Sequence, residues 1–230
     1  MLYAPGAGPV CSACWSRIRR LSPPLCRTCG DPLASWRVVS DALAQCARCR
    51  RRPPALTIAR AAGEYEGSLR DVIHAFKYEG RRGLAAPLGR LAATEGADVL
   101  RGADWVVPVP LHLVRRLQRG FNQADDLTRE LGLPVAHVLW RPRLTAAQTG
   151  LSAWARRRNV RGAFALSPFW RWRRRSDLAG RVVVLVDDVR TTGATLNACA
   201  EVLLDAGVGE VRALTVARAA LPYSRADTAA

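Results

Sequence analysis

An uninterrupted hydrophobic run from Val182 to Val186 is followed directly by two carboxylates, Asp187 and Asp188. A run of this length, rich in β-branched residues, predicts a strand that is covered on both faces, as in a parallel α/β sheet. A loop of Gly and Thr residues comes next, at 191–195, and a helix is predicted after it. The two carboxylates are therefore expected at the carboxyl end of the strand, which is the edge where ligands bind in open α/β sheets.

Hydrophobic spacing predicts further elements before this segment. Between residues 68 and 77, apolar residues recur at the spacing of an amphipathic helix, with Ser68 as the expected N-cap and Lys77 near the negative end. The remaining predicted elements are strands over residues 56–65, 105–110 and 134–140 and helices over residues 84–94 and 124–131. The predicted fold class is therefore α/β, a parallel sheet flanked by helices.

The loop after the acidic strand has the groups needed to hold a phosphate. Its backbone amides, and the hydroxyls of Thr191, Thr192 and Thr195, lie at the positive end of the following helix. The acidic pair cannot hold a phosphate, but it can accept hydrogen bonds from the hydroxyls of a ribose or help to place a Mg²⁺ ion. The simpler interpretation is a strand-turn-helix with a solvated acidic pair and a Thr N-cap. The consistent order of strand, acids, loop and helix favours a sugar phosphate.

The segment VVVLVDDVRTTGAT, residues 182–195, resembles the phosphoribosyl pyrophosphate (PRPP) loop of type I phosphoribosyltransferases. The resemblance implies that Asp187 and Asp188 are the catalytic acidic pair that meets the ribose 2′ and 3′ hydroxyls. It also implies that the loop holds the 5′-phosphate, and the PRPP-binding residues expected there are Thr191, Thr192, Gly193, Ala194 and Thr195.

Two earlier segments extend this resemblance. In the phosphoribosyltransferase fold, the loop after the short strand at 105–110 meets pyrophosphate, and the VPVP turn at residues 107–110 holds this position. The basic segment 115–123 then precedes an amphipathic helix and could close over the pyrophosphate and exclude water. Lys77 lies where a ligand-facing loop begins, although a helix-terminal charge is its simpler interpretation. The PRPP-binding residues expected in these segments are Lys77, Val109, Pro110, Arg119, Asn122 and Gln123.

Six of the seven cysteines lie before residue 50, in three CxxC pairs: Cys11/Cys14, Cys26/Cys29 and Cys46/Cys49. Two such pairs can chelate one tetrahedral Zn²⁺, and the chain shows no secretory signal that would favour disulfides. Sixteen residues separate the second pair from the third, so we assign Cys26, Cys29, Cys46 and Cys49 to one structural zinc. Cys11 and Cys14 either join a shared or incomplete site or belong to a second ribbon that begins upstream of Met1. Cys199, in the helix after the loop, is expected to pack in the core.

The full set of motifs resembles the ComF family, which includes competence proteins. The matching segments are CRTCGDPL (26–33), EYEG (64–67), FKYEG (76–80), VPVPLH (107–112), RGFNQA (119–124), Gln148 with Leu151, Arg158 and Asn159, and the DDVRTTGAT loop. The resemblance implies a type I phosphoribosyltransferase fold with a small N-terminal zinc-ribbon module whose metal is held by four cysteines. The family's ribbon commonly has four CxxC pairs and this chain has three, which leaves the second zinc open and suggests an upstream start codon.

Residues 50–54, RRRPP, are expected to break regular structure between two domains. The expected division is a zinc-ribbon module over residues 1–54, a phosphoribosyltransferase-like domain over 55–222 and a disordered tail over 223–230. No apolar run is long enough to span a membrane, and a cytoplasmic protein without membrane insertion is expected.

The 230-residue chain carries a formal net charge of +16, with 49% hydrophobic residues and a mean hydropathy of −0.03. This charge would favour nucleic acid or another polyanion. However, Lys77 is the only lysine, and so strong a preference for arginine also results from a G+C-rich genome. Arg156–Arg158 and the Trp/Arg run 170–175 mix cations with indoles, as single-strand binders do, although a solvated loop is the favoured interpretation of the run.

The expected function is Mg²⁺-dependent transfer of a phosphoribosyl group from PRPP to an unidentified acceptor, with release of pyrophosphate and a link to DNA uptake in natural transformation. The alternative is a non-catalytic PRPP sensor that binds single-stranded DNA and competence proteins. A zinc-ribbon binder of nucleic acid with a decayed ligand site is the third hypothesis, and the intact acid pair and loop argue against it.

Overall fold

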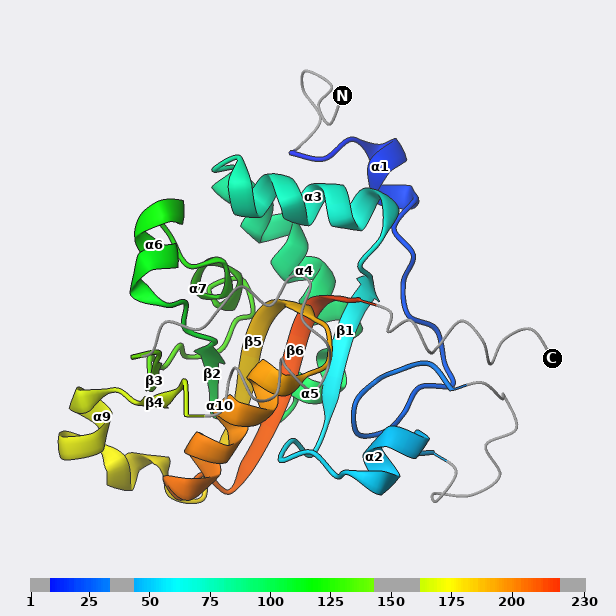
Figure 1. Ribbon diagram of the computed structural model, residues 1–230. Coiled ribbons are helices and arrows are strands. Elements are labelled where there is room, and N and C mark those ends of the chain that lie inside the picture. Colours follow the sequence, from blue (N-terminus) through cyan, green and yellow to red (C-terminus); the bar gives the residue numbers. More distant parts are fainter. Residues whose placement is uncertain (1–8, 34–43, 143–161, 220–230) are drawn as a thin grey trace.

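The computed structural model describes residues 9–33, 44–142 and 162–219. Its centre is a four-stranded sheet in the order β1-β6-β5-β2, and every pairing in it is parallel. Because parallel strands end at the same edge, the carboxyl ends of all four lie together, at the end toward α3 in Figure 1. The strands are β1 (Ala59–Glu64), β2 (Trp105–Pro108), β5 (Val182–Arg190) and β6 (Glu210–Arg218).

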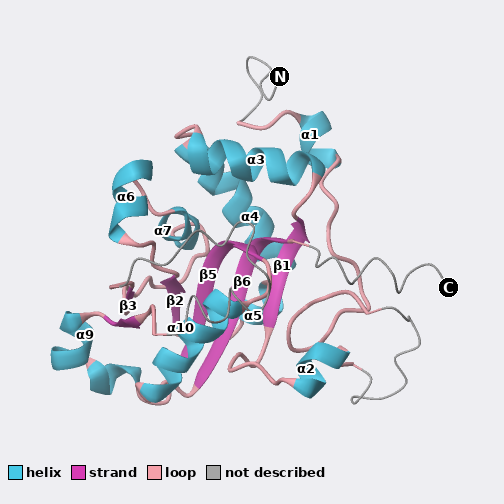
Figure 2. Cartoon of the chain, viewed as in Figure 1, coloured by secondary structure: helices cyan, strands magenta, loops and turns pink. Residues whose placement is uncertain are grey.

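Helices cover both faces of this sheet, as Figure 2 shows. One hydrophobic cluster joins one face of the sheet to α3 (Gly67–Tyr78), α4 (Ala85–Glu95) and α7 (Gln123–Thr128). A second cluster joins the opposite face to α10 (Ala194–Asp205), where Cys199 is buried as expected. The α/β architecture predicted from hydrophobic spacing is confirmed.

Shorter elements connect this framework. They are α1 (Ser12–Ser16), α2 (Ala47–Arg51), η1 (Arg82–Leu84), α5 (Ala97–Leu100), α6 (Leu113–Arg119), α9 (Pro168–Arg173), η2 (Arg175–Leu178), and the antiparallel pair β3 (Leu139–Trp140) and β4 (Ala165–Leu166).

Several predicted elements differ from those in the structure. The strand predicted over 134–140 is wrong except at β3, since Val135 forms only an isolated bridge with Val106. Helix α3 begins at Gly67, where φ is +47°, and its N-cap is Glu66 rather than Ser68. The Trp/Arg run 170–175 is not a loop, because α9 and η2 cover it. Regular structure also continues to Arg51 in α2, inside the predicted break.

The N-terminal segment with the CxxC pairs packs directly on the outer strand β1. The Ala59 amide donates a 2.6 Å hydrogen bond to the Thr28 carbonyl, and Arg20 forms an antiparallel bridge with Gly63. Gly30 approaches so closely that a Cβ there would lie 2.6 Å from the Ala59 carbonyl oxygen. The CxxC segment is thus held against the sheet by backbone contacts.

Some expectations concern other parts of the chain. The predicted tail 223–230, the basic cluster Arg156–Arg158 and the family motif residues between 148 and 159 lie outside the described residues. Within the described ranges, none of the helices has the length and apolar character that a membrane crossing requires.

Candidate functional site

The two carboxylates lie within β5 rather than after it, because this strand continues to Arg190. Alternate residues of a strand face opposite sides of the sheet. Val184 packs in the cluster that contains α3, and Leu185 packs in the cluster that contains α10. Continued along the strand, this alternation directs Asp188 to the α3 side and Asp187 to the α10 side. The acid pair therefore reaches both sides of the carboxyl-end edge.

Lys77, near the end of α3, forms an ion pair with Asp188. The distance from Lys77 Nζ to Asp188 Oδ1 is 2.7 Å, and only 13% and 12% of the two side chains are exposed. Burial acts to lower the pKa of Lys77, but the charge of Asp188 and their hydrogen bond outweigh it and raise this pKa. The only lysine of the chain is therefore a charged part of the site and not a solvated helix terminus.

Among the described residues, no ion pair to Asp187 corresponds to the one between Lys77 and Asp188. Burial, followed by the negative charge of Asp188, raises the pKa of Asp187 to about 7. The Asp188 amide donates a 2.9 Å hydrogen bond to Asp187 Oδ1 and opposes this rise. Carboxyl groups with pKa values near neutrality, next to a second acid, are typical of functional sites.

Residues 191–193 join β5 to the 12-residue helix α10, and the last two residues of the predicted loop, Ala194 and Thr195, are the first two of that helix. Gly193 is the N-cap of α10 and adopts φ of +77°, a left-handed conformation that glycine adopts without strain. The Thr192 hydroxyl accepts a hydrogen bond of 3.3 Å from the Ala194 amide. One of the amides expected to meet a phosphate is thus already satisfied by the loop itself.

These groups surround a cavity of about 360 Å³ at the carboxyl-end edge. This volume is within the range of small-molecule sites. Four of the five expected loop residues line it, and the exception is Thr192. The lining residues that bear on ligand binding are Tyr65, Lys77, Tyr78, Val109, Pro110, Arg115, Arg119, Arg141, Asp187, Asp188, Arg190, Thr191, Gly193, Ala194 and Thr195. Five cationic side chains face two carboxylates there, so the cavity suits an anionic ligand.

Asn122 and Gln123, both expected to bind PRPP, do not line this cavity. The Asn122 side chain donates to the Val109 carbonyl at 3.2 Å and accepts from the Ala124 amide as the N-cap of α7. Gln123 is 1% exposed, and its side-chain oxygen accepts a 3.0 Å hydrogen bond from Arg119. Their contacts in the structure support neighbouring residues that do line the cavity.

Arg141 and Arg190 line the cavity although the sequence did not single them out. Arg141 is 8% exposed and stacks on Phe164, with its Cζ 5.0 Å from the ring centroid. Burial, with Arg115 nearby, lowers the pKa of Arg141. Arg190 is 4% exposed. Their burial is the distinguishing property, and no pattern among 35 Lys and Arg residues indicates it.

A second cavity, of about 640 Å³, lies between the CxxC segment and α10. The two cavities share the wall formed by Arg190, Gly193 and Ala194. Thr192 lines this second cavity, together with Cys29 and Arg48 from the CxxC segment. The segment from Arg190 to Ala194 therefore lies between the cavity with the acidic pair and the cavity beside the cysteine module.

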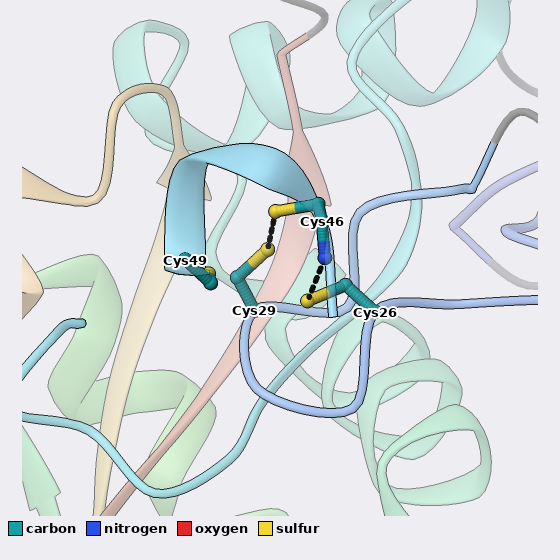
Figure 3. Close-up of side chains that lie close together, drawn as sticks. All are labelled: Cys26, Cys29, Cys46 and Cys49. Atoms are coloured by element: carbon teal, nitrogen blue, oxygen red, sulfur yellow. Dashed lines mark hydrogen bonds between the residues drawn. The ribbon is translucent and has the colours of Figure 1, made fainter. Parts of the chain in front are cut away.

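Four cysteines come together as predicted, in the module drawn in Figure 3: Cys26, Cys29, Cys46 and Cys49. Their sulfur atoms all lie within 4.8 Å of one another, and Cys29 Sγ and Cys46 Sγ are 3.7 Å apart. Tetrahedral zinc thiolates have Zn–S bonds near 2.3 Å and hence S–S separations of ~3.8 Å. Hydrogen bonds from Cys29, then from Cys46 and Cys49, lower the pKa of the Cys26 thiol. The cluster could hold a metal ion, and its geometry fits zinc.

Cys11 and Cys14 do not join this cluster. Among the described residues, the group of metal-ligating side chains contains the other four cysteines alone. Cys11 instead is the N-cap of α1, where its sulfur accepts a 3.4 Å hydrogen bond from the Cys14 amide. Of the two open alternatives for this pair, a site shared with the other four cysteines is therefore not formed.

Comparison with known proteins agrees with this geometry. Residues 110–228 match the phosphoribosyl transferase domain family. The DNA utilization protein YhgH of Escherichia coli K12 is 34% identical over 229 residues, which cover 95% of this chain and 94% of that protein. Competence protein F of Haemophilus influenzae is 33% identical over 91% of this chain and 90% of its own. Competence protein ComFC of Bacillus subtilis is 28% identical over 86% of this chain and 79% of its own length.

The fold is that of a type I phosphoribosyltransferase, with four clustered N-terminal cysteines consistent with a zinc-ribbon module. Within that class, the chain belongs to the ComF family of phosphoribosyltransferase-domain proteins, as its similarity to the competence and DNA utilization proteins shows.

Proposed function

We propose that this protein binds PRPP and transfers its phosphoribosyl group to an acceptor that is not yet identified. The observation that carries the proposal is the meeting of three features at one cavity: the Asp187–Asp188 pair, the loop 191–195 and a wall of cationic side chains. PRPP has a chemical group for each of them, namely ribose hydroxyls, a 5′-phosphate and a pyrophosphate.

Each part of the site has a distinct role in this proposal. The acid pair accepts hydrogen bonds from the ribose hydroxyls, and the loop holds the 5′-phosphate at the start of α10. Arg115 and Arg119 from α6 bind the pyrophosphate and help to exclude water. Lys77 holds the Asp188 carboxylate in place through their 2.7 Å ion pair.

The reaction breaks the bond between ribose C1 and the pyrophosphate oxygen, and pyrophosphate leaves with the electron pair. A lone pair of the acceptor forms the new bond at C1. The protein contributes by fixing the ring and by stabilising the leaving group in a cavity sheltered from water.

Mg²⁺ is a proposed partner of the bound ligand. Mg²⁺ in proteins is commonly held by one or two carboxylates, substrate phosphates and water, and two carboxylates are the acidic ligands at this cavity. Within the described part of the chain, no cluster of three or more acidic or histidine ligands lies there. The ion would neutralise charge on the pyrophosphate. We further propose that the ion at Cys26, Cys29, Cys46 and Cys49 is zinc with a structural role.

Calorimetric titration of PRPP with Mg²⁺ tests binding. Wild type is expected to bind, and Asp187→Asn/Asp188→Asn is expected to weaken binding at least tenfold. Asp104→Asn is the matched control, because Asp104 caps the opposite end of β5 by accepting from the Val182 amide at 2.8 Å. Absence of binding by wild type, or equal binding by the acid-pair variant, would refute the PRPP site.

Release of pyrophosphate tests turnover. Wild type is incubated with PRPP, Mg²⁺ and a panel of bases, amines and nucleic acids, and pyrophosphate is measured enzymatically. Release that depends on one acceptor, and that is lost in Asp187→Asn/Asp188→Asn, supports transfer. PRPP binding without release across the panel favours a sensor instead of an enzyme.

A sensor that binds single-stranded DNA is the second candidate, and one surface favours it. Trp140, Phe169 and Trp172 are 44%, 56% and 78% exposed around β3 and α9, beside Arg171 and Arg174. Exposed aromatic rings next to arginines suit stacked bases and phosphates. The similar proteins named for DNA utilization and competence make a role in DNA uptake part of this proposal.

Single-strand affinity measured over a range of salt concentrations tests this candidate. Arginine–phosphate contacts predict a steep fall of affinity with salt, and Trp172→Ala is expected to weaken binding. Leu204→Ala, at an exposed apolar position on α10, is the control. A flat salt dependence would argue against DNA binding by this surface.

A further inference from the structure

Asp31 joins the cysteine module to the end of the central sheet. Its Oδ1 accepts hydrogen bonds from Arg190 at 2.6 Å and from Arg218 at 2.7 Å, and its Oδ2 accepts from Arg48 at 2.8 Å. Only 15% of the Asp31 side chain is exposed. One largely buried carboxylate thus holds three guanidinium groups, from α2, β5 and β6.

On the module side, Asp31 belongs to the first metal knuckle. It follows Cys29 by two residues, and its carbonyl accepts a 2.8 Å hydrogen bond from the Cys26 amide. Its partner Arg48 lies in α2 between Cys46 and Cys49. The carboxylate of Asp31 therefore depends on both knuckles for its position.

On the sheet side, Asp31 holds the residue that precedes the loop. Arg190 ends β5, and its Cδ is the nearest atom to where a Cβ on Gly193 would lie, at 3.9 Å. Its side chain thus folds against the loop, and it lines both cavities. Arg190 Nε is buried and has no hydrogen-bond partner among the described residues. Arg190 is thus placed to support the loop and to meet an anion bound there.

We propose that Asp31 is a positioning residue that couples the metal state of the four cysteines to binding of a phosphorylated ligand at the loop 191–195. Metal holds the two knuckles together, the knuckles fix Asp31, and Asp31 fixes Arg190 against the loop. Coupling between two sites is reciprocal, so ligand at the loop also strengthens metal retention. The ligand side of this inference rests on the proposed PRPP site.

Loss of the Asp31 charge has a direct physical consequence. Three guanidinium groups that now share one carboxylate would repel one another and lose their common acceptor. Of the three, Arg190 lies next to the loop, so its displacement would loosen residues 191–195. A purely structural ion pair would lower global stability without this local effect.

The test compares Asp31→Asn with Asp104→Asn in the full-length, zinc-loaded protein. Asp104 offers a matched control because it also pairs with an arginine, Arg181, at 2.9 Å, but at the opposite end of β5. Three quantities are measured: hydrogen exchange of the amides at 191–195, affinity for PRPP with Mg²⁺, and the rate of zinc release to a chromogenic chelator with and without PRPP.

Asp31→Asn is expected to speed exchange at 191–195 at least fivefold and to weaken PRPP at least fivefold, the lower end of typical coupling. Asp104→Asn is expected to change each quantity less than twofold. In wild type, PRPP is expected to slow zinc release, and in Asp31→Asn this protection is lost. Unchanged loop exchange in zinc-loaded Asp31→Asn would overturn the coupling.

The outcomes separate this inference from the proposed function. If wild type fails to bind PRPP, the proposed function fails, and loop exchange in the two variants still decides whether Asp31 holds the loop. If Asp31→Asn does not fold, Arg48→Met replaces it, because it removes the ion pair between Asp31 and α2 and leaves Arg190 and Arg218 paired with Asp31. At least twofold faster exchange at 191–195 in Arg48→Met supports the coupling, and exchange equal to wild type overturns it.

Discussion

At the scale of single residues, the site stores electrostatic free energy in a buried acid pair. Asp188 is stabilised by Lys77, whereas Asp187 is desolvated and lies beside another negative charge. Selection for stability alone would not favour two adjacent carboxylates of which only Asp188 has an ion pair in the described part of the chain. The cost is explained if a ribose ligand supplies the missing donors.

The first prediction concerns the pH dependence of stability. The pKa of Asp187 is raised from 3.8 to about 7 on folding, so between these values the folded state holds a proton that the unfolded state has lost. Stability therefore falls as pH rises through this window. Asp187→Asn removes the cost, and we expect it to stabilise the protein by about 1–3 kcal/mol at about pH 8 and little at about pH 4.5.

Urea unfolding of the zinc-loaded protein at the two pH values measures this difference. Asp71→Asn, at an exposed position on α3, is the control and should show equal stability differences at both. An Asp187→Asn variant that is less stable than wild type at the higher pH would contradict the raised pKa.

The second prediction concerns the Lys77–Asp188 ion pair. Lys77→Met leaves the Asp188 charge buried without its partner, and we expect a loss of about 2–4 kcal/mol of stability near neutral pH. The double variant Lys77→Met/Asp188→Asn removes the charge as well and is expected to be more stable than Lys77→Met alone. Urea unfolding of wild type, Lys77→Met, Asp188→Asn and the double variant gives the coupling free energy between the two side chains. If the two single changes in unfolding free energy add up to that of the double variant, the pair is not coupled.

The sequence predicted which residues meet at the cavity where a local pattern marks them. Asp187, Asp188 and the loop are contiguous, so their order alone indicated their shared location. Asn122 and Gln123 follow Arg119, which lines the cavity, but their own side chains form hydrogen bonds with the Val109 carbonyl and with Arg119. Sequence spacing does not show in which direction a side chain points. Arg190 was missed because its distinguishing contact is with Asp31, 159 residues earlier in the chain.

At the scale of elements, hydrophobic periodicity predicted long, buried elements better than short ones. Strand β5 and helices α3 and α4 have a continuous apolar face and were predicted within a few residues. The segment 134–140 has a strand-like composition but forms only two residues of strand. Its other residues pack beside β2 through an isolated bridge at Val135, a tertiary arrangement that a local pattern does not reveal.

The third prediction concerns the contact of α4 with α7. Gly89 lies inside α4, and a Cβ there would lie 2.4 Å from Glu130 Cβ, just after α7. Alanine at Gly89 gains about 1 kcal/mol of helix propensity, but the overlap costs about 1–3 kcal/mol. We therefore expect Gly89→Ala to lower the unfolding free energy or leave it unimproved. Gly83→Ala, where a Cβ would contact nothing within 4 Å, is expected to be neutral or stabilising.

Thermal unfolding of both variants checks this difference. Since Gly83 lies in the short η1 just before α4, the two substitutions change the same residue type in neighbouring elements. A Gly89→Ala protein that is clearly more stable than wild type would show that α4 and α7 separate easily, against the close approach described above.

At the scale of the whole molecule, the cysteine module and the sheet form one interlocked unit. The sequence predicted correctly that these four cysteines come together, because CxxC spacing is a local signal. It did not predict that the module would dock on β1 or that Asp31 would reach β5 and β6, since these contacts join residues far apart in the chain. The boundary predicted at residue 54 separates two segments of the sequence, but contacts between the segments join them in the structure.

The fourth prediction tests this docking. Gly30, with φ of +66°, and Gly102, with φ of +70°, share the same backbone conformation, and alanine at either costs about 1–2 kcal/mol of backbone strain. A Cβ at Gly30 would also lie 2.6 Å from the Ala59 carbonyl oxygen, whereas one at Gly102 meets nothing within 4 Å. Gly30→Ala is thus expected to be less stable than Gly102→Ala by about a further 1–3 kcal/mol.

Because Gly30 lies between Asp31 and Cys29, one of the four proposed zinc ligands, the same variant should also lose zinc faster to a chelator. Gly102→Ala, far along the chain from the module, should release zinc at the wild-type rate. Together, the unfolding free energy and the rate of zinc release show whether contact with β1 helps the cysteine module to retain its metal. Equal zinc release by the two variants would mean that the knuckle holds its metal without support from β1.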